Sequence, residues 1–142
     1  MGERKTFLDR ALGNYKVAEL TLQTMSNDDV CLDICAYHLQ QTKELVLKYI
    51  LELNGIEYPK THKIEQLIQI AADNDVDLFL TEYIDDHSEM LSSWEAESRY
   101  KSSFSVELRK LNKAIKEIGV YLDIVQKNLN SNEESLNTLN LF

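Results

Sequence analysis

The stretch FSVELRKLNKAIKEIGVYLDIVQKNL, residues 104–129, decides the fold that this sequence predicts. Apolar residues recur in it at alternating steps of four and three, which places them on one face of a helix. The same spacing is a heptad pattern, and it suits nearly parallel packing along a bundle or across a dimer. The residues that carry the pattern are Phe104, Leu108, Leu111, Ile115, Ile118, Leu122, Val125 and Leu129.

Two further long helices are predicted upstream of this stretch. Over about residues 5–25, apolar residues from Leu8 to Met25 recur at helical steps and form one stripe. A second helix, over about residues 29–53, carries apolar residues on two sides, so we expect it to pack against neighbours on both and to lie at the centre. Gly55 follows it and can adopt the left-handed conformation that ends a helix.

A short helix and a fourth long helix are predicted in the middle of the chain. Thr61 is the expected N-cap of the short helix, whose buried side includes Ile64 and Leu67. An aspartate-rich turn follows, and a helix with an apolar face over residues 79–94 is expected to end near residues 99–100. The chain therefore alternates helices with short connections.

Few residues in the chain oppose helix formation. Its 142 residues include four glycines and one proline, and no period-2 run of β-branched residues indicates a strand. We expect an all-α fold, an up-and-down bundle of four to five helices, as a single domain over residues 1–130. A polar C-terminal tail over residues 131–142 is expected to follow it.

The acidic charge is concentrated in one segment. Nine acidic residues and no lysine or arginine lie between Asp73 and Glu97, which accounts for the whole net charge of −9. A segment of this kind repels a phosphate backbone and argues against binding to duplex DNA. It is interpreted either as a solvated helix face or as a surface for a basic partner protein.

Neither a metal site nor a cofactor is predicted. Residues 73–77 suggest a calcium loop, but Leu78 and Ile84 stand where that loop needs Gly and Glu. Cys31 and Cys35 lack the spacing of redox or zinc sites and are interpreted as reduced packing residues. Reduced cysteines indicate a cytoplasmic location. With no apolar run of membrane-spanning length and no signal-peptide core at the start, we expect no membrane-spanning segment.

Polar residues within and beside the helices are the candidates for binding. His38 and Gln41 are polar residues within an apolar helix. They are interpreted either as hydrogen-bonded residues at the edge of the core or as part of a subunit interface. A histidine and two lysines at the start of the short helix could bind an anion or fix the loop. Arg99 and Lys101 at the end of the fourth helix are interpreted in one of two ways. They stabilise the helix dipole, or Arg99 contacts a phosphate while a base stacks on Tyr100. The candidate nucleotide- or RNA-binding residues are Lys60, His62, Lys63, Arg99, Tyr100 and Lys101.

Three motifs in order resemble the HEPN family of small helical domains. The first is AYHLQQTKELVLK at residues 36–48, followed by Gly55 and then by YPKTHKI at residues 58–64. The last is the Arg-Tyr pair at residues 99–100. The resemblance covers roughly residues 5–130. It implies a four- or five-helix bundle, a homodimer, and a minimal nucleotidyltransferase as partner in a pair like a toxin and its antitoxin.

The resemblance also bears on catalysis. Many HEPN members are metal-independent ribonucleases marked by an arginine with a histidine about four to six positions later; the histidine moves the proton and the arginine steadies the phosphate. Ser103, Phe104 and Ser105 occupy those positions after Arg99, so no catalytic residue is predicted. We expect a non-catalytic binding or regulatory protein for nucleotide or RNA. The alternative is a metal-independent endoribonuclease with a non-standard site around Arg99, to which folding could bring His62.

Overall fold

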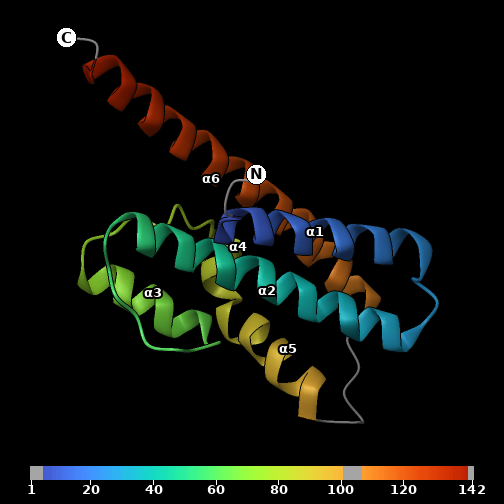
Figure 1. The fold of residues 1–142 in the computed structure, drawn as a ribbon. Helices are drawn as coiled ribbons and strands as arrows, with labels where there is room; N and C mark the ends of the chain where they lie inside the picture. The colour runs from blue at the N-terminus through green and yellow to red at the C-terminus, as the bar shows by residue number, and fades with distance from the viewer. Residues whose placement is uncertain (1–4, 101–106, 141–142) are drawn as a thin grey trace.

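The computed structural model describes residues 5–100 and 107–140, with side chains described over residues 5–94 and 107–130. Within these ranges the chain forms six helices and no strand, which confirms the all-α prediction (Figure 1). The helices are α1 (Phe7–Thr24), α2 (Asp29–Leu53), α3 (Ile64–Asp73), α4 (Glu82–Asp86), α5 (Ser88–Tyr100) and α6 (Leu108–Asn140).

The first two helices form an antiparallel hairpin with side-chain caps at both N-termini. The Thr6 hydroxyl accepts from the backbone N–H of Asp9, and the Asp9 carboxylate accepts from that of Thr6, which is a capping box. Asp28 caps α2 by accepting from the amides of Val30 and Cys31. Both helices lie close to their predicted bounds because short polar residues stand where the backbone amides need acceptors.

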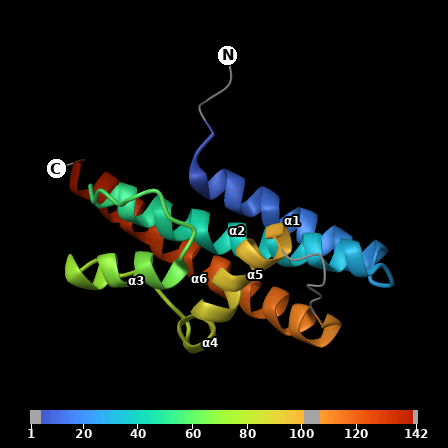
Figure 2. The same ribbon diagram turned by 90° about the horizontal axis from the view of Figure 1, so that it is seen from below.

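The helix α2 lies at the centre of the bundle, as predicted. It packs against α1, α3, α5 and α6. The two views place α3 and α5 on the side of α2 away from α1, with α6 running behind α2 (Figures 1 and 2). The stripe from Leu32 to Ile50 is buried, whereas Ile34, on the other predicted stripe, is 47% exposed. The second stripe is therefore only partly covered.

The heptad stretch forms most of α6, and its apolar positions Leu111, Ile118, Leu122 and Val125 are buried. Leu108 is partly exposed, and the predicted position at residue 104 lies outside the described residues. The helix was expected to end near residue 130, but it continues to Asn140. Figure 1 shows its last turns projecting past the other helices. The hydrophobic pattern alone missed this extension because the later residues are mostly polar.

The predicted fourth helix is divided into two, which corrects the sequence interpretation. Thr81 caps α4, and His87 ends it with φ −109° and ψ 17° before α5 begins. Phe79, expected on the helical face, lies in a turn with φ 57°, and the Asp77 carboxylate accepts from its amide. The apolar spacing continues through both helices, so it carries no sign of the break.

The connection between α2 and α3 follows the prediction at one end and departs from it at the other. Gly55 has φ +70°, the left-handed conformation expected after α2. Thr61 does not cap α3. The N-cap is Lys63, which makes no side-chain cap bond, and the Ile64 amide donates instead to the Ser92 hydroxyl at 2.8 Å. A residue from α5 thus satisfies the α3 amide that a local cap would have served.

Candidate functional site

A series of polar side chains on α2 lies inside the bundle. Gln40, Thr42, Lys43 and Glu44 are buried among the apolar residues of the same helix. An unsatisfied buried polar group costs about 1–3 kcal/mol, so such groups need partners. Among the residues whose side chains are described, every buried nitrogen and oxygen has one. All four side chains are therefore satisfied, and Gln40 and Glu44 are joined in one network.

Glu44 is the hub of this network. Its Oε1 accepts from Nε2 of Gln40 and from Nδ1 of His62, each at 3.0 Å. Its Oε2 accepts from Nζ of Lys48, also at 3.0 Å. One buried carboxylate thus joins two α2 neighbours to the loop before α3, through hydrogen bonds of the strong, charge-assisted kind.

His62 is held at two points by α2. Nε2 of Gln40 donates to its backbone oxygen at 3.2 Å, and the Glu44 carboxylate accepts from its ring. The His62 side chain is nevertheless 55% exposed, whereas that of Glu44 is 3% exposed. The arrangement presents a fixed imidazole at the surface, and it agrees with the interpretation that His62 fixes the loop.

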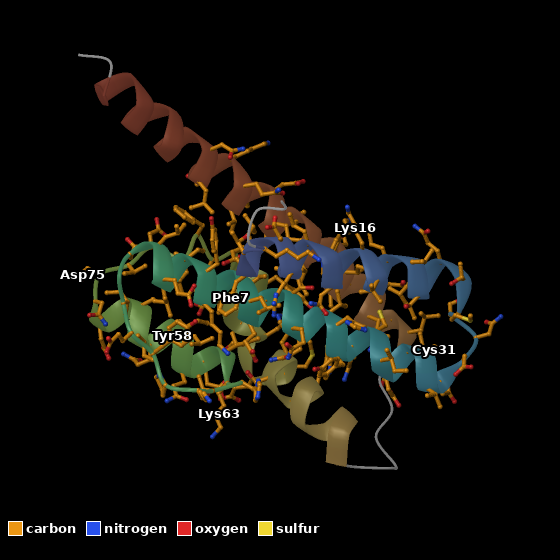
Figure 3. All side chains as sticks on the ribbon, viewed as in Figure 1. Phe7, Lys16, Cys31, Tyr58, Lys63 and Asp75 are labelled. Carbon is orange, nitrogen blue, oxygen red and sulfur yellow. The ribbon has the colours of Figure 1, made fainter. Side chains whose placement is uncertain are left out.

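The two lysines beside His62 are exposed. Figure 3 shows Lys63 at the outer edge of the molecule, next to the start of α3. Lys60 is exposed on the same loop. The first α3 amide, predicted to be available to an anion, donates to Ser92, and the Ser92 hydroxyl donates to Glu65 at 2.7 Å. The cationic side chains are available to a ligand there, whereas this amide is not.

The second predicted cluster lies at the end of α5. Arg99 and Tyr100 belong to its last turn, and their side chains lie outside the described residues, as does the whole of Lys101. Ser92, which contacts the start of α3, precedes Arg99 by seven residues. Two helical turns separate them, so the two backbone positions share one face of α5. Both predicted clusters therefore belong to elements that meet at Ser92.

The predicted interface residues lie at a groove between α1 and α2. The groove has a volume of about 550 Å³ and an open mouth. Gln41 lines it directly, and Nδ1 of His38 is 2.7 Å from Oδ1 of Asn14, which also lines it. The lining residues are Arg10, Gly13, Asn14, Val17, Tyr37, Gln41 and Leu45.

Lys43 is the most unusual buried group. Its side chain is fully buried, and Nζ donates to the backbone oxygen of Ile84 in α4 at 3.5 Å. Burial lowers the pKa of Lys43 to about 7, against an attraction from Asp85 that raises it. The amine therefore changes charge within the bundle near neutral pH.

The described part of the chain has neither a cluster of metal-ligating residues nor a membrane-spanning helix. No group of three or more His, Cys, Asp or Glu residues there could hold a metal ion. No helix there is long and apolar enough to cross a membrane.

The fold and the network define a small helical domain whose central helix holds a surface histidine. The HEPN domain model matches residues 5–129, so the chain belongs to the HEPN family. No curated protein and no solved structure matches the chain. The sequence-based recognition of the family is thus confirmed over the bundle.

The sequence interpretation missed the residues that hold the site together. Gln40, Lys43 and Glu44 lie in the first motif of the family resemblance and were assigned no role. The signal available was the spacing of four between the polar residues Gln40, Glu44 and Lys48. That spacing places their side chains on one face, which the structure covers with the loop before α3.

Proposed function

We propose that this HEPN protein is a non-catalytic binding or regulatory protein that acts as a homodimer. Its partner would be a minimal nucleotidyltransferase, in a pair like a toxin and its antitoxin. Lys60, His62 and Lys63 would attract a nucleotide or RNA through phosphate contacts, which supply most of the sequence-independent affinity for nucleic acids. The end of α5, with Arg99 and Tyr100, would extend this contact.

The observation that carries the proposal is the exposed apolar face of the α1–α2 hairpin. Val17 and Leu20 on α1, and Val30 and Ile34 on α2, are large apolar residues with 45–67% of their surface exposed. Val17 also lines the groove, whose α2 side continues the stripe of Ile34. An exposed apolar patch of this kind is typical of a protein–protein interface.

A second copy of the chain fits this face as its occupant. A two-fold contact buries the same patch on both copies, so one apolar face suffices for assembly. Gly13 lies in the groove with no atom within 4 Å of where its Cβ would be, which leaves room for close approach of another helix. HEPN domains are often dimeric, which supports the same occupant.

Light scattering on a matched pair of variants tests this interface. Val17 is 45% exposed on the α1–α2 face, and Val120 is 46% exposed on α6, outside it. Val17→Asp is expected to give monomers where the parent is a dimer, because burying an unpaired charge is unfavourable. Val120→Asp is expected to leave the dimer intact. Equal effects of the two changes, or none, would remove the support for this face.

The contact between Glu44 and His62 favours one alternative, a metal-independent endoribonuclease. A carboxylate that orients an imidazole is the usual support for a proton-transferring histidine. The alternative predicts RNA cleavage by the purified protein that is lost in Arg99→Ala. Cleavage that persists in this variant, or none by the parent, would reject it.

A further inference from the structure

The imidazole of His62 is oriented more firmly than an exposed side chain requires. Two buried α2 residues, Gln40 and Glu44, use polar atoms to hold its backbone and its ring. Burying polar and charged groups costs free energy. It is therefore unusual that the buried Gln40 amide and the buried Glu44 carboxylate both form hydrogen bonds with an exposed loop residue. The ring is thus held by a buried carboxylate while it remains open to solvent.

The hydrogen bond to Glu44 also fixes the tautomer. A carboxylate only accepts, so Nδ1 of His62 carries the hydrogen, and the neutral ring has its lone pair on Nε2. No hydrogen bond joins Nε2 to the residues whose side chains the structure describes. The free lone pair is the nucleophilic site of an imidazole.

The other two histidines differ in the partner of Nδ1. Nδ1 of His38 pairs with the amide oxygen of Asn14, and Nδ1 of His87 with the backbone oxygen of Tyr83. Both partners are neutral, and His87 also stacks on the Tyr83 ring, with 4.1 Å between ring centroids. Among the side chains that the structure describes, His62 is the only histidine with an anionic partner, and this partner can stabilise positive charge that develops on the ring as Nε2 attacks an electrophile.

The neighbours of His62 suit an anionic electrophile. Lys60 and Lys63 flank it in sequence and are exposed, so their flexible cationic side chains can reach a group bound at the ring. A phosphoryl group adds negative charge and acceptor oxygens, and cations beside it stabilise it through charge-assisted hydrogen bonds. A phosphoryl group therefore matches both the ring and its surroundings.

We propose that His62 is a phosphoryl-acceptor site that is modified at Nε2 by a small-molecule phosphoryl donor such as an acyl phosphate. The Nε2 lone pair attacks phosphorus and forms the N–P bond. The bond from phosphorus to the carboxyl oxygen of the donor breaks, and the carboxylate leaves with that electron pair. The Nδ1 hydrogen stays in its bond with Glu44, whose charge balances the phosphorylated ring.

Chemical phosphorylation of the purified protein tests this site. The protein is incubated with phosphoramidate, in which attack by Nε2 breaks the donor P–N bond and releases ammonia. The expected result is one phosphoryl group per chain, lost in mild acid, retained in base and mapped by fragmentation mass spectrometry to His62. Failure of the parent protein to gain this group, or equal labelling of His38 or His87, would overturn the proposal.

One variant separates positioning of the His62 ring by Glu44 from mere exposure of the ring. Glu44→Gln removes the anionic acceptor and is expected to slow labelling by about tenfold or more, since partners that orient an imidazole typically matter to this extent. Its thermal melt shows whether the fold is retained. A folded Glu44→Gln protein that is labelled at the parent rate would overturn the role of Glu44.

The lysines are tested with a control of the same chemistry. Lys60→Gln with Lys63→Gln is expected to slow labelling, whereas Lys110→Gln, an exposed change on α6, is expected to leave the rate unchanged. Equal rates in all three proteins would contradict the role given to the lysines. The labelling of His62 tests this proposal separately from the proposed homodimer, because the parent protein can be labelled whether or not it assembles through α1 and α2.

Discussion

The hydroxyl of Tyr15 occupies the space that Gly119 leaves by having no side chain. Tyr15 on α1 donates to the backbone oxygen of Ile115 at 3.0 Å, and a Cβ built on Gly119 would overlap this hydroxyl. The contact joins the first and last helices of the bundle, and α1 packs on α6 here. Glycine is needed inside α6 because of this neighbour, although its backbone conformation is ordinary.

Gly119→Ala is accordingly expected to destabilise the protein. The overlap would force the Tyr15 ring to move, at a cost of about 1–3 kcal/mol. Lys110→Ala is the control, since it is an exposed change on α6 outside this contact and is expected to alter stability little. Urea unfolding measures both. Adding Tyr15→Phe to Gly119→Ala should recover part of the loss, and no recovery would mean that the hydroxyl is not the source of the strain.

Because the pKa of Lys43 is lowered by burial, we expect the stability of the protein to rise with pH. Its pKa is lowered from 10.5 to about 7 in the folded protein, so between these values the unfolded chain binds the proton and the folded chain does not. The free energy of unfolding should then rise by about 1.4 kcal/mol per pH unit above pH 7. The best window is pH 7 to 9, because burial raises the pKa of Cys35 to about 12, which lowers stability at higher pH.

Lys43→Met removes the source of this dependence. Relief of the buried charge should stabilise the protein at pH 7 by up to about 5 kcal/mol and flatten the dependence on pH. Lys110→Met, an exposed change, is expected to alter neither. Denaturant unfolding of the three proteins at pH 7 and pH 9 provides the comparison. An unchanged slope in Lys43→Met would show that another group titrates.

Glu44 and His62 should contribute unequally to stability although they share a hydrogen bond. Glu44→Ala removes the buried carboxylate that accepts from Gln40 and Lys48, and we expect a loss of about 2–4 kcal/mol. His62 is more than half exposed, so His62→Ala should cost about 1 kcal/mol or less. Thermal unfolding of both variants measures the difference. A larger loss in His62→Ala would mean that the loop, and not α2, organises the network.

Apolar periodicity and capping residues were sufficient to predict much of the fold. They placed α1 and α2 because residues such as Asp28 cap the helices and the stripes follow a period of 3.6. They could not separate α4 from α5, because the break at His87 interrupts hydrogen bonds without interrupting the stripe. They also could not show that Thr61 does not cap α3. The residue that accepts from the α3 amide in its place, Ser92, is distant in sequence.

The candidate site was predicted in part. His62 was chosen from its sequence neighbours, but its partner Glu44 was not, since a glutamate in a helix is normally a surface residue. The burial of Lys43 was missed for the same reason. Glu44 and Lys43 are buried because the loop before α3 and the helix α4 cover α2. This is an effect of tertiary packing, which the local sequence does not show.

The central claim, that the α1–α2 face joins two copies of this chain, is tested most directly by sedimentation equilibrium of the unmodified protein at micromolar concentration. A mass of twice 16.5 kDa is the predicted result, with conversion to the single-chain mass in Ile34→Asp. A parent protein that sediments at the single-chain mass over the whole concentration range would contradict it.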